Sequence, residues 1–284
     1  MEAVFCRPTM SEKDFRRFST FIENECGIKM PLSKKFFLES RFMKRLWKLD
    51  IKSFSEYYNY VFSPKGITGE ISNMIDVVTT NKTDFFREPA HFDYLIQEIL
   101  PELVTKEKMG FRKKLMVWSA GCSTGEEPYT LAIVMNEFAE KNAGFSYSIL
   151  ASDISTRVLE KAKVGIYEQE RIWPIPTELR KKYLLKSKDR DSGIVRIVPE
   201  LRTRVKFIRL NLMDDDFGFQ ERMDIIFCRN VLIYFDKPSQ KRLIEKLCHC
   251  LSPGGYIFIG HSETLHGLDV SLLGVAPAIY RYNP

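Results

Sequence analysis

The chain has 284 residues, 44% hydrophobic and 28% charged, with a formal net charge of +6, and this composition is that of ordinary globular proteins. Its length suits one large or two smaller domains, and no apolar run approaches the roughly 18 residues needed to span a bilayer. Because no cysteine pair has C-x-x-C spacing and the amino terminus lacks a secretory pattern, we expect a cytoplasmic protein with reduced thiols, no metal and no direct membrane insertion.

The first 80 residues are predicted to form a helical domain. Ser11 is typical of a helix cap, Phe15, Phe18 and Ile22 follow at helical spacing, and Gly27 is typical of a helix end. Further helices are predicted over residues 33–49, 53–62 and 67–78 and, after a linker, over 90–100.

The second of these helices is strongly basic. Arg41, Arg45, Lys48 and Lys52 recur at the spacing of one helical face, beside an apolar face that includes Phe42. Residues 33–52 hold seven basic and two acidic side chains, a net charge of +5. An isolated basic face is usually solvated, so this pattern alone identifies no partner.

From residue 114 onward, strands and helices alternate, and this alternation predicts a parallel sheet. The expected strands cover residues 115–118, 147–152, 205–210, 223–228, 256–259 and 279–282, and the expected helices cover 128–140, 155–163 and 238–251. Residues 165–204 do not fit the alternation and contain a β-like run, so a small β-rich insertion is predicted there.

A glycine loop over residues 119–125 joins the first strand to its helix, with Thr124 as a possible cap. Gly121 and Gly125 have G-x-x-x-G spacing and no lysine follows, which excludes both a P-loop and a dinucleotide fingerprint. Two carboxylates, Glu126 and Glu127, would repel a pyrophosphate. The loop therefore favours a nucleoside-like ligand that carries positive charge, and S-adenosylmethionine fits that description.

Asp153 ends the next expected strand, where a carboxylate can accept hydrogen bonds from both ribose hydroxyls of an adenosyl group. The alternative is an aspartate that only starts the following helix.

Six motifs in order then identify a family resemblance. They are Asn-Lys-Thr-Asp-Phe-Phe-Arg-Glu (81–88), Ser-Thr-Gly-Glu-Glu-Pro-Tyr (123–129), Ala-Ser-Asp (151–153), Asn-Leu (211–212), Phe-Cys-Arg-Asn-Val-Leu-Ile-Tyr-Phe-Asp (227–236) and Gly-His-Ser-Glu (260–263). Together they closely resemble the CheR family of chemotaxis receptor glutamate methyltransferases, over residues 11–282.

The resemblance implies an α/β fold of the class I, Rossmann-like methyltransferase type with a mostly parallel sheet. It also implies an N-terminal all-α domain over residues 1–80 that recognises the substrate and a linker over 81–92 that contributes to the active site. The methyltransferase domain would cover 93–284, with a small antiparallel β-subdomain inserted at 165–204.

The implied activity is methyl transfer from S-adenosylmethionine to glutamate carboxylates of chemotaxis receptors, giving glutamyl methyl esters and S-adenosylhomocysteine. The implied cofactor contacts are Asn81, Thr83, Arg87, Glu127, Asp153, Asn211, Leu212, Arg229 and Asn230. Arg87 and Tyr234 are the catalytic candidates, and the sequence leaves open whether Arg87 holds the carboxylate of the cofactor or of the substrate.

The resemblance also gives the basic helix a partner. The cytoplasmic domain of a receptor is acidic and helical, so Arg41, Lys44, Arg45 and Lys48 are expected to bind it. In some family members the β-subdomain docks the carboxyl-terminal tail of a receptor, and the sequence leaves open whether this one does.

Two other functions compete with this interpretation. A class I methyltransferase acting on another acidic protein or on nucleic acid is one, but a base-modifying enzyme would need an Asn/Asp-Pro-Pro-Tyr type motif after the fourth strand. This chain has Cys-Arg-Asn-Val-Leu-Ile-Tyr there, so no nucleic-acid partner is expected. The other is a non-catalytic sensor of S-adenosylmethionine, which the intact active-site candidates disfavour.

Overall fold

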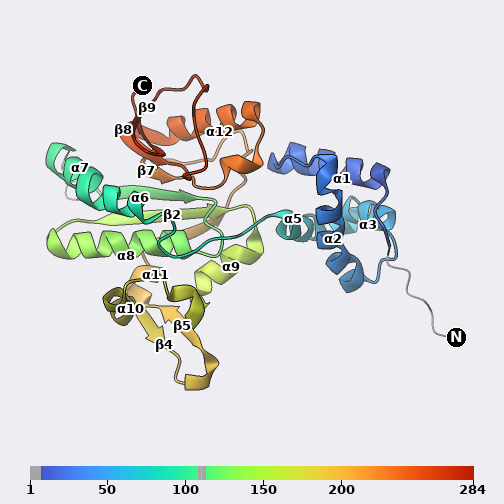
Figure 1. Ribbon diagram of the computed structural model, residues 1–284, viewed down its shortest axis with the longest axis horizontal. Coiled ribbons are helices and arrows are strands. Elements are labelled where there is room, and N and C mark those ends of the chain that lie inside the picture. Colours follow the sequence, from blue (N-terminus) through green and yellow to red (C-terminus); the bar gives the residue numbers. More distant parts are fainter. Residues whose placement is uncertain (1–7, 108–109, 111–112) are drawn as a thin grey trace. The chain divides into compact units, whose positions relative to one another are not determined.

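The structure is a computed structural model that describes residues 8–107, 110 and 113–284 (Figure 1). Its internal contacts divide the chain into two units. The helical unit contains the residues up to Thr80 together with Tyr234–Asp236, and the sheet unit contains Asn81–Ile233 and Lys237–Pro284.

The helical unit follows the predicted order of helices. Its helices are α1 (Glu12–Cys26), α2 (Lys35–Leu49, after a 3₁₀ turn at Leu32–Lys34), α3 (Phe54–Val61), α4 (Pro64–Ile67) and α5 (Glu70–Val78). Ser11 caps α1 by accepting a hydrogen bond from the Asp14 N–H, and Gly27 ends it in the left-handed conformation. The helix predicted over 67–78 is α5, which begins three residues later at Glu70, because Gly69 separates it from the short α4.

An aromatic cluster forms the core of this unit. The rings of Phe18 and Phe42 lie 4.7 Å apart and those of Phe42 and Tyr57 lie 5.4 Å apart, both edge to face. All three side chains are fully buried, which explains why α1, α2 and α3 carry apolar residues at helical spacing.

Arg45 belongs to this core and not to the exposed face of α2. It is 8% exposed, and its Nε and Nη2 donate to the Glu70 carboxylate at 2.8 and 2.6 Å. The Tyr57 hydroxyl donates to the same carboxylate at 2.8 Å. The prediction that Arg45 binds substrate is therefore corrected. Its spacing places it beside the other basic residues of α2, but its side chain is buried and paired with Glu70.

The sheet unit contains a seven-stranded sheet in the order β6-β2-β1-β7-β8-β10-β9. The first five strands of that order are parallel, and β10 and β9 are antiparallel to their neighbours. Their bounds are β1 (Leu115–Ala120), β2 (Tyr147–Asp153), β6 (Val205–Arg209), β7 (Met223–Phe227), β8 (Leu251–Phe258), β9 (Leu272–Ala276) and β10 (Ile279–Tyr282). This mostly parallel sheet confirms the predicted α/β class, whereas β9 was not predicted.

Helices flank this sheet in the expected alternation (Figure 1). They are α6 (Pro89–Tyr94), a π turn (Leu95–Ile99), α7 (Leu100–Glu107), α8 (Glu126–Lys141), α9 (Thr156–Val164) and α12 (Lys237–Cys250). Helix α8 begins two residues before the predicted start at 128, and Gly125 is its N-cap residue in place of Thr124.

The predicted insertion forms a separate antiparallel sheet, shown in yellow and orange in Figure 1. Its order is β3-β5-β4, with β3 (Ile166–Glu168), β4 (Leu184–Lys186), β5 (Ile194–Ile197), α10 (Thr177–Tyr183) and α11 (Pro199–Arg202). Lys182 of α10 pairs with Glu137 of α8 at 2.6 Å, and the Tyr183 hydroxyl donates to the same carboxylate at 2.6 Å. These contacts connect the insertion to the carboxyl-terminal half of α8.

Two of the bulk expectations concern membranes and thiols. Over the described ranges, no helix combines the length and the apolar character needed to cross a bilayer. Five cysteines in these ranges are free thiols, namely Cys26, Cys122, Cys228, Cys248 and Cys250.

Candidate active site

The topology of the sheet gathers the predicted site residues at one edge. Strands β6, β2, β1 and β7 are neighbours and parallel, so their carboxyl ends lie together. Asp153 ends β2, Asn211 follows β6, Arg229 follows β7, and the glycine loop follows β1. In open α/β sheets this edge is where ligands bind.

Two positions of the glycine loop require glycine, because each has a positive φ and no space for a Cβ atom. Gly121 has φ 81°, and a Cβ there would lie 2.7 Å from Val231 Cγ2; Gly125 has φ 98°, and its Cβ would lie 2.8 Å from the Tyr167 hydroxyl oxygen. Between them, Ser123 also has a positive φ of 49°. Its backbone N–H donates to Asp153 Oδ2 at 2.8 Å, which ties the loop to the end of β2.

Asp153 is 8% exposed and holds two backbone groups at once. Oδ2 accepts from Ser123, and Oδ1 accepts from the Ser155 N–H at 2.9 Å. Because a carboxylate oxygen can accept more than one hydrogen bond, these contacts are compatible with ribose hydroxyls as further donors. The two alternatives weighed from sequence therefore do not exclude each other: Asp153 organises the loop and the start of α9, and its contact with ribose hydroxyls stays a prediction.

Arg229 is the buried cation at the centre of the site. Its side chain is 2% exposed, and its Nη1 and Nη2 lie 3.3 Å from Glu127 Oε2 and 3.1 Å from Glu88 Oε2. Nη2 also donates to the backbone carbonyl of Arg87. The guanidinium carbon lies 5.4 Å from the ring centre of Phe92, which shields the group from water. The guanidinium is therefore fixed in place by two carboxylates and a carbonyl.

Glu88 is a site residue that the sequence analysis missed. Besides Arg229, its carboxylate accepts from Asn230 Nδ2 at 3.3 Å and from the His261 N–H at 3.3 Å. Burial alone would raise the pKa of Glu88, but Arg229, Asn230 and His261 together lower it, so the carboxylate stays charged. The signal that could have pointed to it is its place at the end of the motif over residues 81–88, next to Arg87.

The two carboxylates after the loop have different roles. Glu127 accepts from the Ser119 hydroxyl at 2.7 Å and pairs with Arg229, and its burial raises its pKa despite that pairing. Glu126 is 1% exposed and pairs with Arg171 at 2.6 Å. Of the two acids, Glu127 therefore faces Arg229 and Glu126 faces Arg171 of the insertion.

The charges of the cluster fit a cationic ligand. Four carboxyl groups, those of Glu88, Glu127, Asp153 and Glu263, lie in the network with the guanidinium groups of Arg87 and Arg229. This excess of acidic over basic groups suits S-adenosylmethionine, which carries a sulfonium and an ammonium against one carboxylate, and it disfavours a pyrophosphate.

One other group of side chains has the composition of a metal site. Glu88, His91 and His261 bring three possible ligand atoms within 4.8 Å of one another. Glu88 is already paired with Arg229, and burial, Arg229 and His261 lower the pKa of His91 to about 4. An added cation would face the guanidinium across a shared carboxylate, so the arrangement fits a neutral histidine packed under an ion pair better than a metal centre.

Four further predicted residues lie in this unit. The Asn81 carbonyl accepts from the Ser123 hydroxyl at 2.9 Å, and Arg87 Nη1 donates to the Lys82 carbonyl at 3.1 Å. Thr83 and Leu212 are buried. Tyr234 groups with the helical unit, so its catalytic role stays a prediction, as do the individual roles of the other predicted residues.

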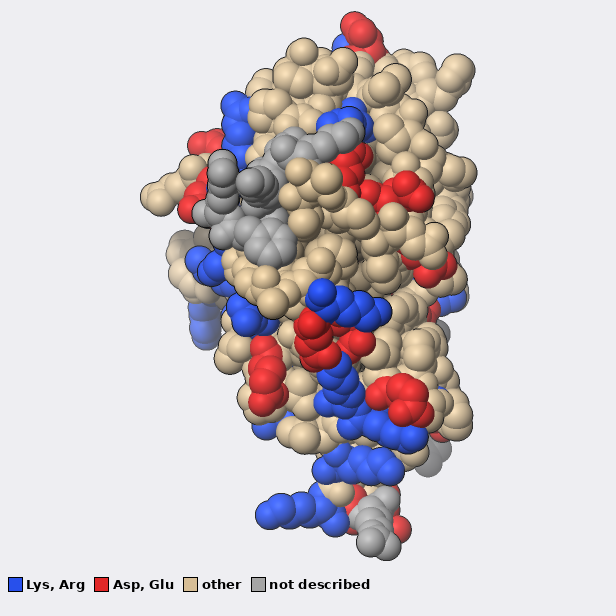
Figure 2. Space-filling model, turned by 90° about the vertical axis from the view of Figure 1, so that its left-hand side faces the viewer, with Lys and Arg blue, Asp and Glu red and all other residues tan. Residues whose placement is uncertain are grey.

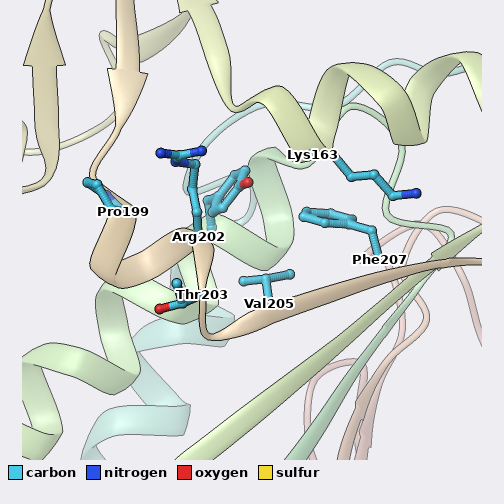
Figure 3. Close-up of a pocket in the computed structure, with 7 residues that line it drawn as sticks. Lys163, Pro199, Arg202, Thr203, Val205 and Phe207 are labelled. Carbon is cyan, nitrogen blue, oxygen red and sulfur yellow. The ribbon is translucent and has the colours of Figure 1, made fainter.

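A pocket of about 300 Å³ lies elsewhere in the sheet unit (Figure 3). It is lined by Tyr129, Lys163, Pro199, Arg202, Thr203, Val205 and Phe207. None of these is a predicted site residue, so the pocket is separate from the cluster around Arg229.

Comparison with known proteins decides the family. Residues 81–274 match the SAM-binding domain of CheR methyltransferases, and residues 13–79 match their all-alpha domain. A chemotaxis protein methyltransferase of Borreliella burgdorferi is 40% identical over 275 residues, which cover 96% of this chain and 95% of the relative. One from Escherichia coli is 35% identical over 263 residues, covering 93% and 88%.

The chain belongs to the CheR methyltransferase family. This confirms the predicted resemblance, the enzyme class and the cofactor: the protein is a methyltransferase that uses S-adenosylmethionine. The CheR SAM-binding domain contains the whole network of Glu88, Glu127, Asp153 and Arg229.

Proposed function

We propose that this CheR-family enzyme methylates glutamate side-chain carboxylates of chemotaxis receptors in the cytoplasm and so forms glutamyl methyl esters. The observation that carries the proposal is the site's combination of a fixed buried cation with an excess of acidic over basic groups. A glutamate substrate is already ionised at pH 7, because its pKa is about 4.3, so the site needs to position two reactants and exclude water. Relatives named chemotaxis protein methyltransferase support the receptor as substrate.

Each side chain of the network has a role in that proposal. S-Adenosylmethionine supplies an activated methyl group on its sulfonium. Asp153 accepts hydrogen bonds from the ribose hydroxyls of the cofactor, and the carboxylate of Glu127 stabilises its positive charge. Asn211 and Leu212 lie beside its adenine ring. Arg229 and Asn230, which both donate hydrogen bonds to Glu88, lie beside the methyl group that is transferred.

Arg87 is proposed to orient the substrate carboxylate. One of its guanidinium nitrogens, Nη1, donates to the Lys82 carbonyl, and this contact leaves further N–H donors of the planar group for a carboxylate. Because a tight ion pair would reduce the nucleophilicity of the attacking oxygen, a partly engaged arginine suits an orienting role.

The exposed side of α2 is proposed as the receptor-binding surface. Lys44 and Lys48 are exposed and Arg41 is half-buried. Phe36 and Trp47 are 73% and 69% exposed, and Phe36, Lys44 and Trp47, at i, i+8 and i+11, lie on the same side of the helix. A basic surface with exposed aromatic side chains suits an amphipathic helix with acidic residues.

The small sheet is proposed to dock the carboxyl-terminal tail of a receptor. Strands β3 and β4 form its two edges, and Ile166 and Leu185 on them are 40% and 48% exposed. An extended peptide can add to such an edge as another strand. At the lower end of Figure 2, where this sheet lies, Lys and Arg side chains alternate with Asp and Glu side chains, so a peptide that docks there can make contacts with both charges.

A methyl-transfer assay tests the proposal directly. The purified enzyme is incubated with radiolabelled S-adenosylmethionine and the cytoplasmic fragment of a receptor. The label should appear in the fragment and be released as methanol under mild base, because carboxyl methyl esters hydrolyse readily. Label that survives base would reject the glutamate substrate, and failure to bind S-adenosylhomocysteine would reject the cofactor site as well. A matched fragment with glutamine at the candidate glutamates is the control.

A further inference from the structure

The side chain of Arg171 connects the small sheet to the linker and to the first turn of α8. Arg171 lies in a 3₁₀ turn (Gln169–Ile172) that directly follows β3. Its Nη2 donates to the Thr83 carbonyl at 2.7 Å and to Glu126 Oε1 at 2.6 Å, and its Nη1 lies 3.5 Å from Asp84 Oδ1. One planar group thus joins three parts of the chain: the insertion, the linker before α6 and the first turn of α8.

The partners of Arg171 are themselves held tightly. Glu126 is 1% exposed, and its second oxygen accepts from the Thr124 hydroxyl at 2.6 Å. Thr83 is 8% exposed. A guanidinium that pairs with so deeply buried a carboxylate has little freedom to move, because leaving would strand the charge of Glu126 without a cation.

Tyr167 of β3 makes a second contact of the same kind. Its hydroxyl donates to the Thr124 carbonyl at 2.8 Å, and its ring packs edge-on against Phe85 at 4.9 Å. Both side chains therefore come from the start of the insertion and contact the linker; Tyr167 also contacts the end of the glycine loop, and Arg171 the first turn of α8.

We propose that Arg171 is a positioning residue for S-adenosylmethionine, because it holds the linker at Thr83 against the first turn of α8 and so closes the cofactor site from the side of the small sheet. The inference rests on the proposed placement of the cofactor beside the linker and the glycine loop. It gives the insertion a role in cofactor affinity that is separate from peptide docking. Arg171 is not required at the reacting atoms, since it contacts neither Arg229 nor Asp153.

The test compares Arg171→Met with Arg171→Lys in the full-length enzyme. Methionine keeps much of the length of the side chain and removes all donors, and lysine restores the charge beside Glu126 without the planar fork. We expect Arg171→Met to bind S-adenosylhomocysteine about tenfold more weakly by calorimetry, the scale of one charge-assisted hydrogen bond. The KM for S-adenosylmethionine should rise by a similar factor while kcat at saturating cofactor changes less than about twofold. Arg171→Lys should recover part of the affinity.

Arg180→Met is the matched control. Arg180 lies in the same insertion, and its guanidinium contacts Thr177 and the ring of Trp173, both within the insertion. This variant should bind the cofactor as the wild type does.

Two results would overturn the inference: an unchanged KM in Arg171→Met, whether or not kcat falls, or an equal loss of cofactor affinity in Arg180→Met. If the wild type itself fails to bind S-adenosylhomocysteine, the proposed cofactor placement fails instead, so the two failures are distinguishable. Should Arg171→Met not fold, Arg171→Lys against the wild type gives the same KM comparison.

Discussion

The guanidinium of Arg45 and the carboxylate of Glu70 form a bidentate ion pair inside the helical unit, with N···O distances of 2.8 and 2.6 Å. Their side chains are 10% and 4% exposed. This pair joins the middle of α2 to the first turn of α5, and Tyr57 of α3 donates to the same carboxylate. One buried charge pair thus connects three helices of the unit.

Arg45→Met should therefore lower the free energy of unfolding of the enzyme and leave its charge-dependent binding of the receptor unchanged. Removing one partner of a buried ion pair leaves the other charge uncompensated, at a cost of about 3 kcal/mol in the free energy of unfolding. Urea unfolding monitored by circular dichroism measures the change. Lys48→Met on the exposed face is the control and should change stability by less than about 0.5 kcal/mol. Equal stabilities of the two variants would contradict the assignment of Arg45 to the core.

Reversing the exposed charges of α2 should weaken receptor binding alone. In the double variant Lys44→Glu/Lys48→Glu, we expect the KM for a receptor fragment to rise about tenfold, because an acidic helix meets two reversed charges. The salt dependence of KM should fall as well. Calorimetry with S-adenosylhomocysteine should give the wild-type affinity, and a loss of that affinity would place these lysines in the cofactor site instead. Lys13→Glu on α1 serves as a control of equal chemistry.

Replacement of Arg229 should disturb the geometry of the reacting end. Arg229→Gln leaves Glu88 and Glu127 without their shared cation, and we expect kcat to fall about 100-fold, the scale of a misplaced active-site group. Because Arg229 lowers the pKa of Glu88, its removal raises that pKa, and the acidic limb of the pH–rate profile should move to higher pH.

Arg222→Gln is the control for this experiment, since Arg222 donates only to the Leu251 carbonyl among the contacts described for it. Its pH–rate profile should match that of the wild type. A profile of Arg229→Gln that also superimposes on the wild type would show that the ion pair with Glu88 is unimportant for activity.

His91 should make the stability of the sheet unit depend on pH. Burial first, and then Arg229 and His261, lower its pKa to about 4, against 6.5 for the free side chain. Between these values the unfolded chain binds a proton that the folded chain does not, so the free energy of unfolding falls as the pH falls from 6.5 toward 4. At pH 5 the loss should be about 2 kcal/mol.

The variant His91→Phe removes this titration and keeps an aromatic ring in contact with Phe258. Urea unfolding at pH 7.5 and pH 5.0 should show a gap between wild type and variant that changes by about 2 kcal/mol in favour of the variant at the lower pH. Parallel pH dependences of the two proteins would mean that His91 does not carry the effect.

The sequence predicted best what depends on chain direction and spacing. Alternating strands and helices imply a parallel sheet, and in such a sheet the residues after the strands meet at one edge. Asp153 could therefore be grouped with the glycine loop from the order of the strands, whereas Asn211 and Arg229 were named from the family resemblance. The insertion was found in the same way, since 40 residues had no place in the alternation.

Other features depend on contacts that no local pattern records. The spacing of Arg45 on α2 is the same for an exposed and a buried arginine, and Glu70, which decides the matter, lies 25 residues away. Glu88 adopts a left-handed backbone conformation, with φ 57°, that is uncommon for glutamate. Strand β9 has mostly exposed residues and a glycine, so it lacks the alternation that marks a half-buried strand.

The position of the insertion between α9 and β6 also bears on how the chain folds. Strand β6 pairs with β2 from Ile149↔Val205 to Asp153↔Arg209, so the pairing must close a loop that contains the entire insertion. The entropy lost on closure grows with the length of flexible chain, and a loop that already holds its own three-stranded sheet behaves as a shorter one. Early formation of β3, β5 and β4 would thus speed the addition of β6 to the edge of the central sheet. Variants that destabilise the small sheet should accordingly lower the rate of refolding more than they raise the rate of unfolding.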